Sequence, residues 1–200
     1  MATIAELLAS SLNALKQVQR GDDFTIIKSS DIPRTHIKRL VDNYFLKPII
    51  KGWYVVTDPR VMPGDSTAWY ALFWNFITRY ANERYGNEWC LSAEQSLAIY
   101  SRSTIVPNQV LIRAPKGNNY VVRLIPPTSI FNLGAELPLK VDTNNPYKLN
   151  LYTLSEAIIM ATPAMYRNDA LTMRTVLAMV HDSSEILKIL VDTGQTARDK

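Results

Sequence analysis

One short segment restricts the possible folds of this chain more than any other, because a helical apolar stripe is followed at once by two β-rich runs. The stripe recurs at positions i, i+3, i+4 and i+7, which is the spacing of one buried helix face. Its members are Ile37, Leu40, Val41 and Tyr44. The runs 47–50 and 53–56 flank Lys51-Gly52, which predicts two strands joined by a tight hairpin turn. The segment therefore predicts a helix followed by an antiparallel hairpin.

The residues before this segment predict a further helix and a short strand. Apolar residues from Ile4 to Val18 have helical spacing, and we expect this amphipathic helix to end near Gly21. Residues 24–27 are β-rich and form a short run. The order helix, strand, helix, hairpin is that of a winged helix-turn-helix.

The connection into the second helix is brief. Ser30 or Asp31 can cap this helix, and Pro33 is tolerated in its first turn. Only residues 28–32 could supply the first helix of a helix-turn-helix pair, as about one turn. We therefore expect a shortened helix-turn-helix, in which this turn braces the second helix.

Positive charge is concentrated in the same segment. The chain has a net charge of +4, and residues 24–56 hold six basic side chains against only Asp31 and Asp42. A localised basic face is typical of contact with phosphate, although a solvated lysine-rich surface has the same composition. The residues that we predict to bind double-stranded DNA are Lys28, Arg34, Thr35, His36, Lys38, Arg39, Lys47 and Lys51. Those between positions 34 and 39 are expected in a groove, and Lys47 and Lys51 on phosphates.

A stretch rich in proline, glycine and aspartate, residues 58–65, marks a domain boundary. We predict a winged-helix domain over residues 1–59 and a mixed domain over residues 66–194. In the second domain, aromatic residues between positions 69 and 80 have helical spacing, which favours a buried helix face over a platform for stacked nucleobases.

The rest of the second domain alternates between strand and helix patterns. Ser92 with Gln95 three residues later predicts a capped helix that runs to Tyr100. The β-rich runs 109–114 and 120–125 are separated by a turn-rich stretch and predict a second hairpin. Further patterns predict a strand at 149–152 and helices at 155–160, 168–180 and 183–190. The fold class is therefore α+β, with a small sheet flanked by helices.

The sequence holds no motif for catalysis, metal binding or a cofactor. Its two histidines, His36 and His181, are far apart, and neither phosphate-binding glycine loop is present. The run from His181 to Glu185 contains triad residue types, but a helix start with serine as cap explains the same residues. An enzyme would need a cleft that gathers Glu94, Arg113 or His181. We expect a protein without catalysis, metal or cofactor.

Cysteine use and hydropathy predict the compartment. The single cysteine, Cys90, lies between Trp89 and Leu91 and is expected to pack rather than react. One cysteine excludes an intramolecular disulfide and indicates a reducing compartment. No signal peptide is visible, and no run approaches the roughly 20 apolar residues that cross a bilayer. We therefore expect a cytoplasmic protein that does not enter a membrane.

Several stretches of this sequence resemble two known families. Residues 27–36 and 38–41, followed by the Lys-Gly-Trp-Tyr run at 51–54, resemble the winged-helix region of AbiEi-type antitoxins. The likeness continues through Gly64 to Tyr70, Trp89 to Leu97, Val106-Pro107 and Arg113 to Gly117. This longer pattern is similar to the region that precedes the Fic domain in some Fic family proteins, and it covers nearly the whole chain.

The two resemblances imply different partners. An AbiEi-like antitoxin would bind its own operator and counter a toxin encoded beside it, which is a nucleotidyltransferase. A Fic-associated region would precede an AMP-transferring domain, whose HxFxxGNGRxxR motif and inhibitory [ST]xxxE[GN] sequence are both absent here. The expected function is a DNA-binding autoregulator of a toxin–antitoxin or phage-defence operon. The alternative is a regulatory or interaction module for a cognate toxin or a Fic domain.

Overall fold

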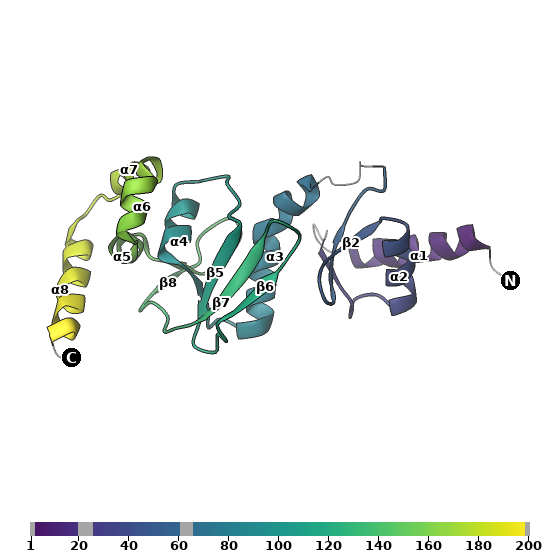
Figure 1. The fold of residues 1–200 in the computed structure, drawn as a ribbon, viewed down its shortest axis with the longest axis horizontal. Helices are drawn as coiled ribbons and strands as arrows, with labels where there is room; N and C mark the ends of the chain where they lie inside the picture. Colours follow the sequence, from purple (N-terminus) through teal and green to yellow (C-terminus); the bar gives the residue numbers. More distant parts are fainter. Residues whose placement is uncertain (1–2, 20–25, 61–65, 199–200) are drawn as a thin grey trace. The chain divides into compact units, whose positions relative to one another are not determined.

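The computed structural model describes residues 3–19, 26–60 and 66–198. Over these residues the chain is mixed α+β, with eight helices and three small sheets of three, four and two strands (Figure 1). The α+β class predicted from the sequence is confirmed. The chain forms two compact units, Met1–Phe76 with Arg123–Thr128, and Ile77–Val122 with Ser129–Lys200. Each unit is described by itself.

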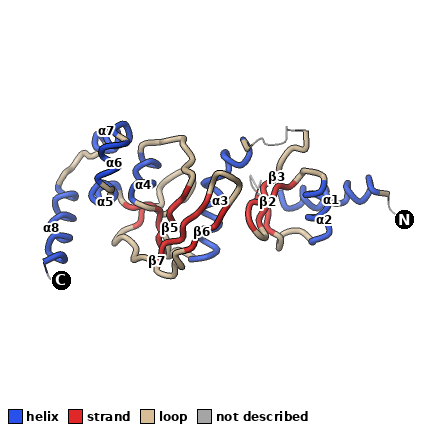
Figure 2. The backbone as a smooth tube through the Cα atoms, viewed as in Figure 1, coloured by secondary structure: helices blue, strands red, loops and turns tan. Residues whose placement is uncertain are grey.

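The first unit has the predicted order of helix, strand, helix and hairpin. Its elements are α1 (Ile4–Gln19), β1 (Ile26–Lys28), α2 (Arg34–Asp42), β2 (Leu46–Ile50) and β3 (Trp53–Val56). The strands form an antiparallel sheet in the order β1-β3-β2, with the hairpin strands close to α1 and α2 in Figure 2. The predicted turn at Lys51-Gly52 is confirmed, and Gly52 has a φ of +83°. Gly21, Phe24 and Thr25, which belonged to the predicted helix end and strand, lie outside the described residues.

The core of the first unit joins α1, β1, α2 and β2. Leu40 of α2 and Ile27 of β1 are fully buried, and Ile37 lies on the same side of α2. The buried members of this cluster are Leu15, Ile27, Ile32, Ile37, Leu40 and Leu46. Three of the four stripe residues therefore pack as predicted. Tyr44 does not, because it follows the end of α2 and is 75% exposed.

The start of α2 differs from the prediction. Ser30 and Asp31 do not cap it, since the N-cap residue is Pro33 and no side chain accepts a hydrogen bond from the first turn. Asp31 instead accepts a hydrogen bond from the Lys28 backbone N–H at 2.9 Å, and Ser30 Oγ donates to Asp31. Residues 29–31 form a hydrogen-bonded turn rather than a helical one. The carboxylate of Asp31 closes this turn, so it is not available to the helix.

Helix α3 (Thr67–Tyr85) contributes to the first unit through its residues up to Phe76. Trp69 and Phe76 are buried, with ring centroids 5.3 Å apart in an edge-to-face arrangement. Trp53 packs on Phe76 at 5.5 Å, and the Trp69 indole N–H donates to Thr128 Oγ1 at 3.1 Å. These aromatic side chains form core, as their helical spacing predicted.

The main sheet of the second unit has the order β4-β5-β7-β6. Its strands are β4 (Cys90–Leu91), β5 (Gln109–Ala114), β6 (Tyr120–Arg123) and β7 (Ser129–Gly134). The hairpin predicted between 109–114 and 120–125 is wrong, because β7 pairs in parallel with β5 and separates it from β6 (Figure 1). The polar residue Asn132 interrupts the apolar pattern of β7. It is nevertheless fully buried, and its Oδ1 accepts from the Tyr85 hydroxyl at 2.9 Å.

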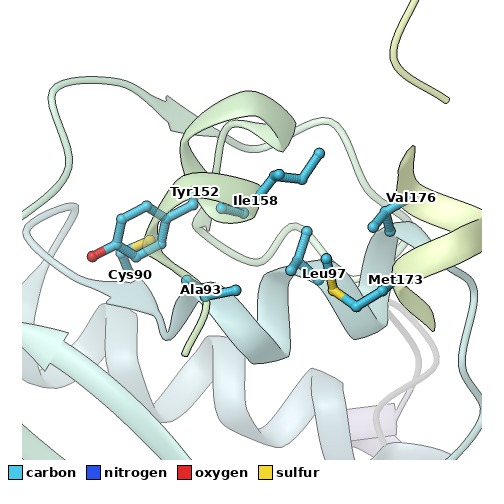
Figure 3. Close-up of a cluster of buried hydrophobic side chains, with 9 residues drawn as sticks. Cys90, Ala93, Leu97, Tyr152, Ile158, Met173 and Val176 are labelled. Carbon is cyan, nitrogen blue, oxygen red and sulfur yellow. The ribbon is translucent and has the colours of Figure 1, made fainter. Parts of the chain in front are cut away.

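Helices and a two-stranded sheet complete the second unit. They are α4 (Ala93–Tyr100), β8 (Val141–Asp142), β9 (Leu151–Tyr152), α5 (Leu154–Met160), α6 (Pro163–Asn168), α7 (Ala170–Ala178) and α8 (Ser184–Arg198). Ser92 caps α4 by accepting from the Gln95 N–H at 3.2 Å, as predicted. Leu97, Ile158, Met173 and Val176 pack in one buried cluster with Cys90 and Tyr152 (Figure 3). No helix among the described residues is long and apolar enough to cross a membrane.

Candidate nucleic-acid interface

Helix α2 separates an apolar face from a basic one. Ile37 and Leu40 are buried in the core of the first unit. Successive helical residues are 100° apart, so positions 35 and 38 fall on the side of the helix away from Ile37 and Leu40, with position 34 beside them. Arg34, Thr35 and Lys38 are all exposed. The structure therefore brings three of the predicted residues together on the outer face of one anchored helix.

The N-terminal end of α2 favours an anion. No side chain caps it, and its first turn contains no acidic residue. The first N–H groups of a helix lack partners within the helix and carry a partial positive charge. Arg34 is the first residue of α2 and adds a full positive charge at this end. Together these groups suit a phosphate or another anion.

His36 occupies a different position from its neighbours. Its Nδ1 lies 2.9 Å from Ser11 Oγ of α1, and Ser11 is fully buried. Because Ser11 Oγ also donates to the Leu7 carbonyl at 3.0 Å, the tautomer that satisfies both bonds has the His36 Nδ1–H donating to Ser11. His36 is therefore half-buried at the side of α2 that meets α1, and it fixes the helix in place.

The hairpin tip is held next to the turn that precedes α2. The Ser29 N–H donates to the Gly52 carbonyl at 2.8 Å, and a Cβ at Gly52 would lie 3.2 Å from Ser29 Oγ. Lys51 is exposed at this tip. Lys28 is half-buried, with its Nζ 5.2 Å from the centroid of the Trp53 ring. Lys51 thus extends the exposed basic surface, whereas Lys28 packs on the sheet.

The remaining predicted residues, Arg39 and Lys47, are half-buried on α2 and β2. Tyr44 was missed as a surface residue, because its helical spacing assigned it to the core. Ser29 was also missed, since its contact with Gly52 depends on the folded hairpin. We define the basic surface as Arg34, Thr35, Lys38 and Lys51, the exposed members of the predicted set.

Three of the residues considered for catalysis, Glu94, Arg113 and Asp182, have structural partners. Glu94 Oε1 accepts from the Thr162 N–H at 3.2 Å, and Arg113 Nη2 donates to the Glu136 carbonyl at 3.3 Å. At the start of α8 the Ser184 hydroxyl and the Ser184 N–H both donate to Asp182, and these hydrogen bonds lower the pKa of the Asp182 carboxyl. The helix start predicted there is confirmed, with Asp182 rather than a serine side chain as the acceptor.

Cys90 packs as predicted. Its side chain is fully buried, and burial with the nearby Glu156 carboxylate raises the pKa of the thiol to about 12. The thiolate needed for nucleophilic chemistry is therefore disfavoured. Within the described residues, no group of three or more histidine, cysteine, aspartate or glutamate side chains has an arrangement suited to a metal ion.

No protein-family model and no curated protein matches this chain. The functional argument therefore depends on the basic surface itself.

Proposed function

We propose that this chain is a cytoplasmic, non-catalytic DNA-binding regulator whose first unit is a winged helix. The observation that carries this proposal is the basic surface, in which an anchored helix and an adjoining hairpin tip present Arg34, Thr35, Lys38 and Lys51. The strand order β1-β3-β2 behind α2 supports the winged-helix assignment.

The dimensions of α2 suit the major groove of B-form DNA. Its nine residues extend about 14 Å at a rise of 1.5 Å each, and the major groove, about 12 Å wide, admits a helix. Arg34 and Thr35 would then reach base edges, with Lys38 and Lys51 on phosphates. Lys28, Arg39 and Lys47 would contribute charge from the flanks.

The connection into α2 is too short to hold a supporting helix, but α1 contacts α2 directly. A helix-turn-helix ordinarily uses its first helix to support the recognition helix. Here residues 29–31 form only a turn, and the Ser11–His36 hydrogen bond joins α1 to α2 instead. The recognition helix would thus be braced by α1.

The biological role that we propose follows from the resemblance to AbiEi-type antitoxins. The chain would repress the toxin–antitoxin or phage-defence operon that encodes it, and the operator would lie upstream of its own gene. The second unit would bind the cognate toxin.

A binding assay on the full chain tests the DNA contact. We would measure fluorescence anisotropy with a labelled duplex from the upstream region between 50 and 200 mM salt. The variant Arg34→Ala/Lys38→Ala should lose roughly 10- to 100-fold in affinity, and each lost phosphate contact should reduce the log–log salt slope by about 0.9.

A matched control separates local contact from overall charge. Arg174→Ala/Lys188→Ala removes the same two residue types from exposed positions in α7 and α8. It should bind DNA as the wild type does. Equal losses in the two double variants would contradict the proposed interface, as would an unchanged affinity in Arg34→Ala/Lys38→Ala.

A second candidate function is an interaction module for a toxin or a Fic domain. Exposed apolar side chains on the last helices favour it, namely Leu171, Leu177, Leu187, Leu190 and Val191. Co-expression with the neighbouring gene product would distinguish the candidates. A stable complex that is lost in Leu171→Ser/Leu187→Ser, together with no binding to the upstream duplex, would favour the interaction module.

A further inference from the structure

Tyr44 has a backbone conformation that tyrosine rarely adopts. Its φ is +61°, in the left-handed region that favours glycine. The Phe45 N–H donates to the Leu40 carbonyl at 2.8 Å, and the Tyr44 N–H donates to the Val41 carbonyl at 3.0 Å. This pair of bonds defines a Schellman motif, in which the left-handed position is usually a glycine. Tyr44 is therefore held where a side chain is sterically disfavoured.

Packing does not compensate for this conformation. The side chain of Tyr44 is 75% exposed, so it contributes little to the core of the first unit. Its backbone is also fixed from the hairpin side, because Thr57 Oγ1 donates to the Tyr44 carbonyl at 2.7 Å. The fold thus presents an aromatic side chain on a rigid backbone. Strained residues of this kind are concentrated at binding sites.

We infer that Tyr44 contacts the DNA backbone, with its hydroxyl donating to a phosphate and its ring packing against the adjoining deoxyribose. The inference rests on the proposed function, since it adds a contact at the C-terminal end of α2. Tyrosine hydroxyls are among the donors that position proteins on phosphates.

The net charge of the segment that contains Tyr44 favours duplex DNA as the partner. Tyr44 lies two residues beyond the helix that carries Arg34 and Lys38, in the segment that holds the net positive charge of the chain. Asp42 is an exposed acidic residue at the end of α2. Asp42 and the C-terminal end of the helix dipole disfavour an anion here, so a phosphate contact at this end would come from a neutral donor such as the Tyr44 hydroxyl.

Two substitutions at Tyr44 test the inference in the full chain. Tyr44→Gly relieves the left-handed conformation, so its melting temperature should be no lower than that of the wild type. Its affinity for the upstream duplex should nevertheless fall roughly tenfold. Tyr44→Phe keeps the ring and should lose about threefold. Neither should change the salt slope, because a neutral contact releases no counterion.

The controls distinguish this contact from a structural role and from the wider proposal. Tyr120→Gly and Tyr120→Phe alter an exposed tyrosine of the second unit and should leave affinity unchanged. Wild-type affinity in Tyr44→Gly would overturn the inference while leaving the proposed function in place. A parallel loss of affinity and melting temperature would overturn it as well, since Tyr44 would then be structural. If the wild-type chain bound no DNA in a salt-dependent manner, both proposals would fail.

Discussion

Helices α2 and α4 have nearly the same length, nine and eight residues, but they serve different purposes. None of the residues of α4 is exposed, and Ser92 caps its first turn. Gln95 also bonds across to β5, accepting from the Leu111 N–H at 3.0 Å and donating to the Gln109 carbonyl at 2.9 Å. Helix α2 has no side-chain cap and exposes Arg34 and Lys38.

Helix α4 supports the fold of the second unit, whereas α2 presents charged side chains on the surface. In α4 the polar side chains complete hydrogen bonds within the second unit. In α2 the half turned away from the core carries charge. Substitutions of buried residues should therefore lower stability in both places, but only those that support α2 should also weaken DNA binding.

The largest loss in the free energy of unfolding is expected when the buried leucines are truncated. Leu40 and Leu97 are both fully buried, and Leu→Ala substitutions at such sites cost about 2–5 kcal/mol. We expect urea unfolding to show this loss in both variants. Only Leu40→Ala should also weaken DNA binding, because α2 rests on that side chain. If the two variants bound DNA equally well at temperatures where both are folded, the claim that α2 binds DNA and α4 does not would be contradicted.

A smaller effect is expected from two buried helical serines. Ser11 Oγ donates to Leu7 O at 3.0 Å and meets His36, while Ser96 Oγ donates to the Ser92 carbonyl at 2.9 Å and accepts from the Tyr152 N–H at 3.2 Å. Ser96→Ala leaves a buried N–H unsatisfied and should cost about 1–3 kcal/mol.

Ser11→Ala should lower the free energy of unfolding by less, about 1 kcal/mol, because the half-buried His36 ring can hydrogen-bond to water instead. It should still weaken DNA binding, since α2 loses its bond to α1. Chemical denaturation and anisotropy on the same samples would check both expectations. A Ser11→Ala variant with wild-type DNA affinity would show that α2 needs no such brace.

The smallest effect is expected at Glu156 in α5, which is the one charged residue buried within the described part of the chain. Burial raises the pKa of its carboxyl, while a hydrogen bond from the Leu139 backbone opposes the shift. The folded state therefore binds this proton more tightly than the unfolded state does. Protonation stabilises fully below the unfolded pKa, and that stability is lost as pH rises through the folded pKa.

Glu156→Gln should accordingly raise the melting temperature at pH 7, and the difference from wild type should shrink as pH falls toward 4. Thermal unfolding across this pH range would measure it. DNA affinity should not change, because Glu156 lies in the second unit. A lower melting temperature in the variant at pH 7 would show that the carboxylate is stabilised by its hydrogen bonds more than burial destabilises it.

The candidate site could be predicted in part, because most of it depends on local spacing. Periodicity predicted the outward direction of Arg34 and Lys38, and Lys51-Gly52 predicted the hairpin tip. His36 belongs to the same run, yet it bonds to Ser11, which is 25 positions away. Lys28 likewise packs on Trp53 of a neighbouring strand. The sequence alone could not reveal these long-range contacts.

In the fold, too, contacts between residues close in sequence were predicted and contacts between distant residues were not. The hairpin of strands 47–50 and 53–56 was predicted, because its two strands are adjacent in sequence. The pairing of β5 with β7 was not predicted, because Asn132 interrupts the apolar pattern of β7. The buried amide of Asn132 is satisfied by hydrogen bonds with tyrosines of α3, which are distant in sequence. Tyr44 was placed in the core for its spacing, whereas the left-handed end of α2 turned it outward.

The sequence by itself determined most of the helices, the first hairpin, the α+β class and the location of the positive charge, but it predicted one helix over 168–180 where the structure has the end of α6 and then α7. These features follow from side-chain periodicity and from turn residues that act over a few positions. The tertiary structure alone decided the order of strands in the second unit, which cations remain exposed and where Tyr44 lies. Those outcomes depend on contacts between distant residues, where burial and hydrogen bonding outweigh local preference.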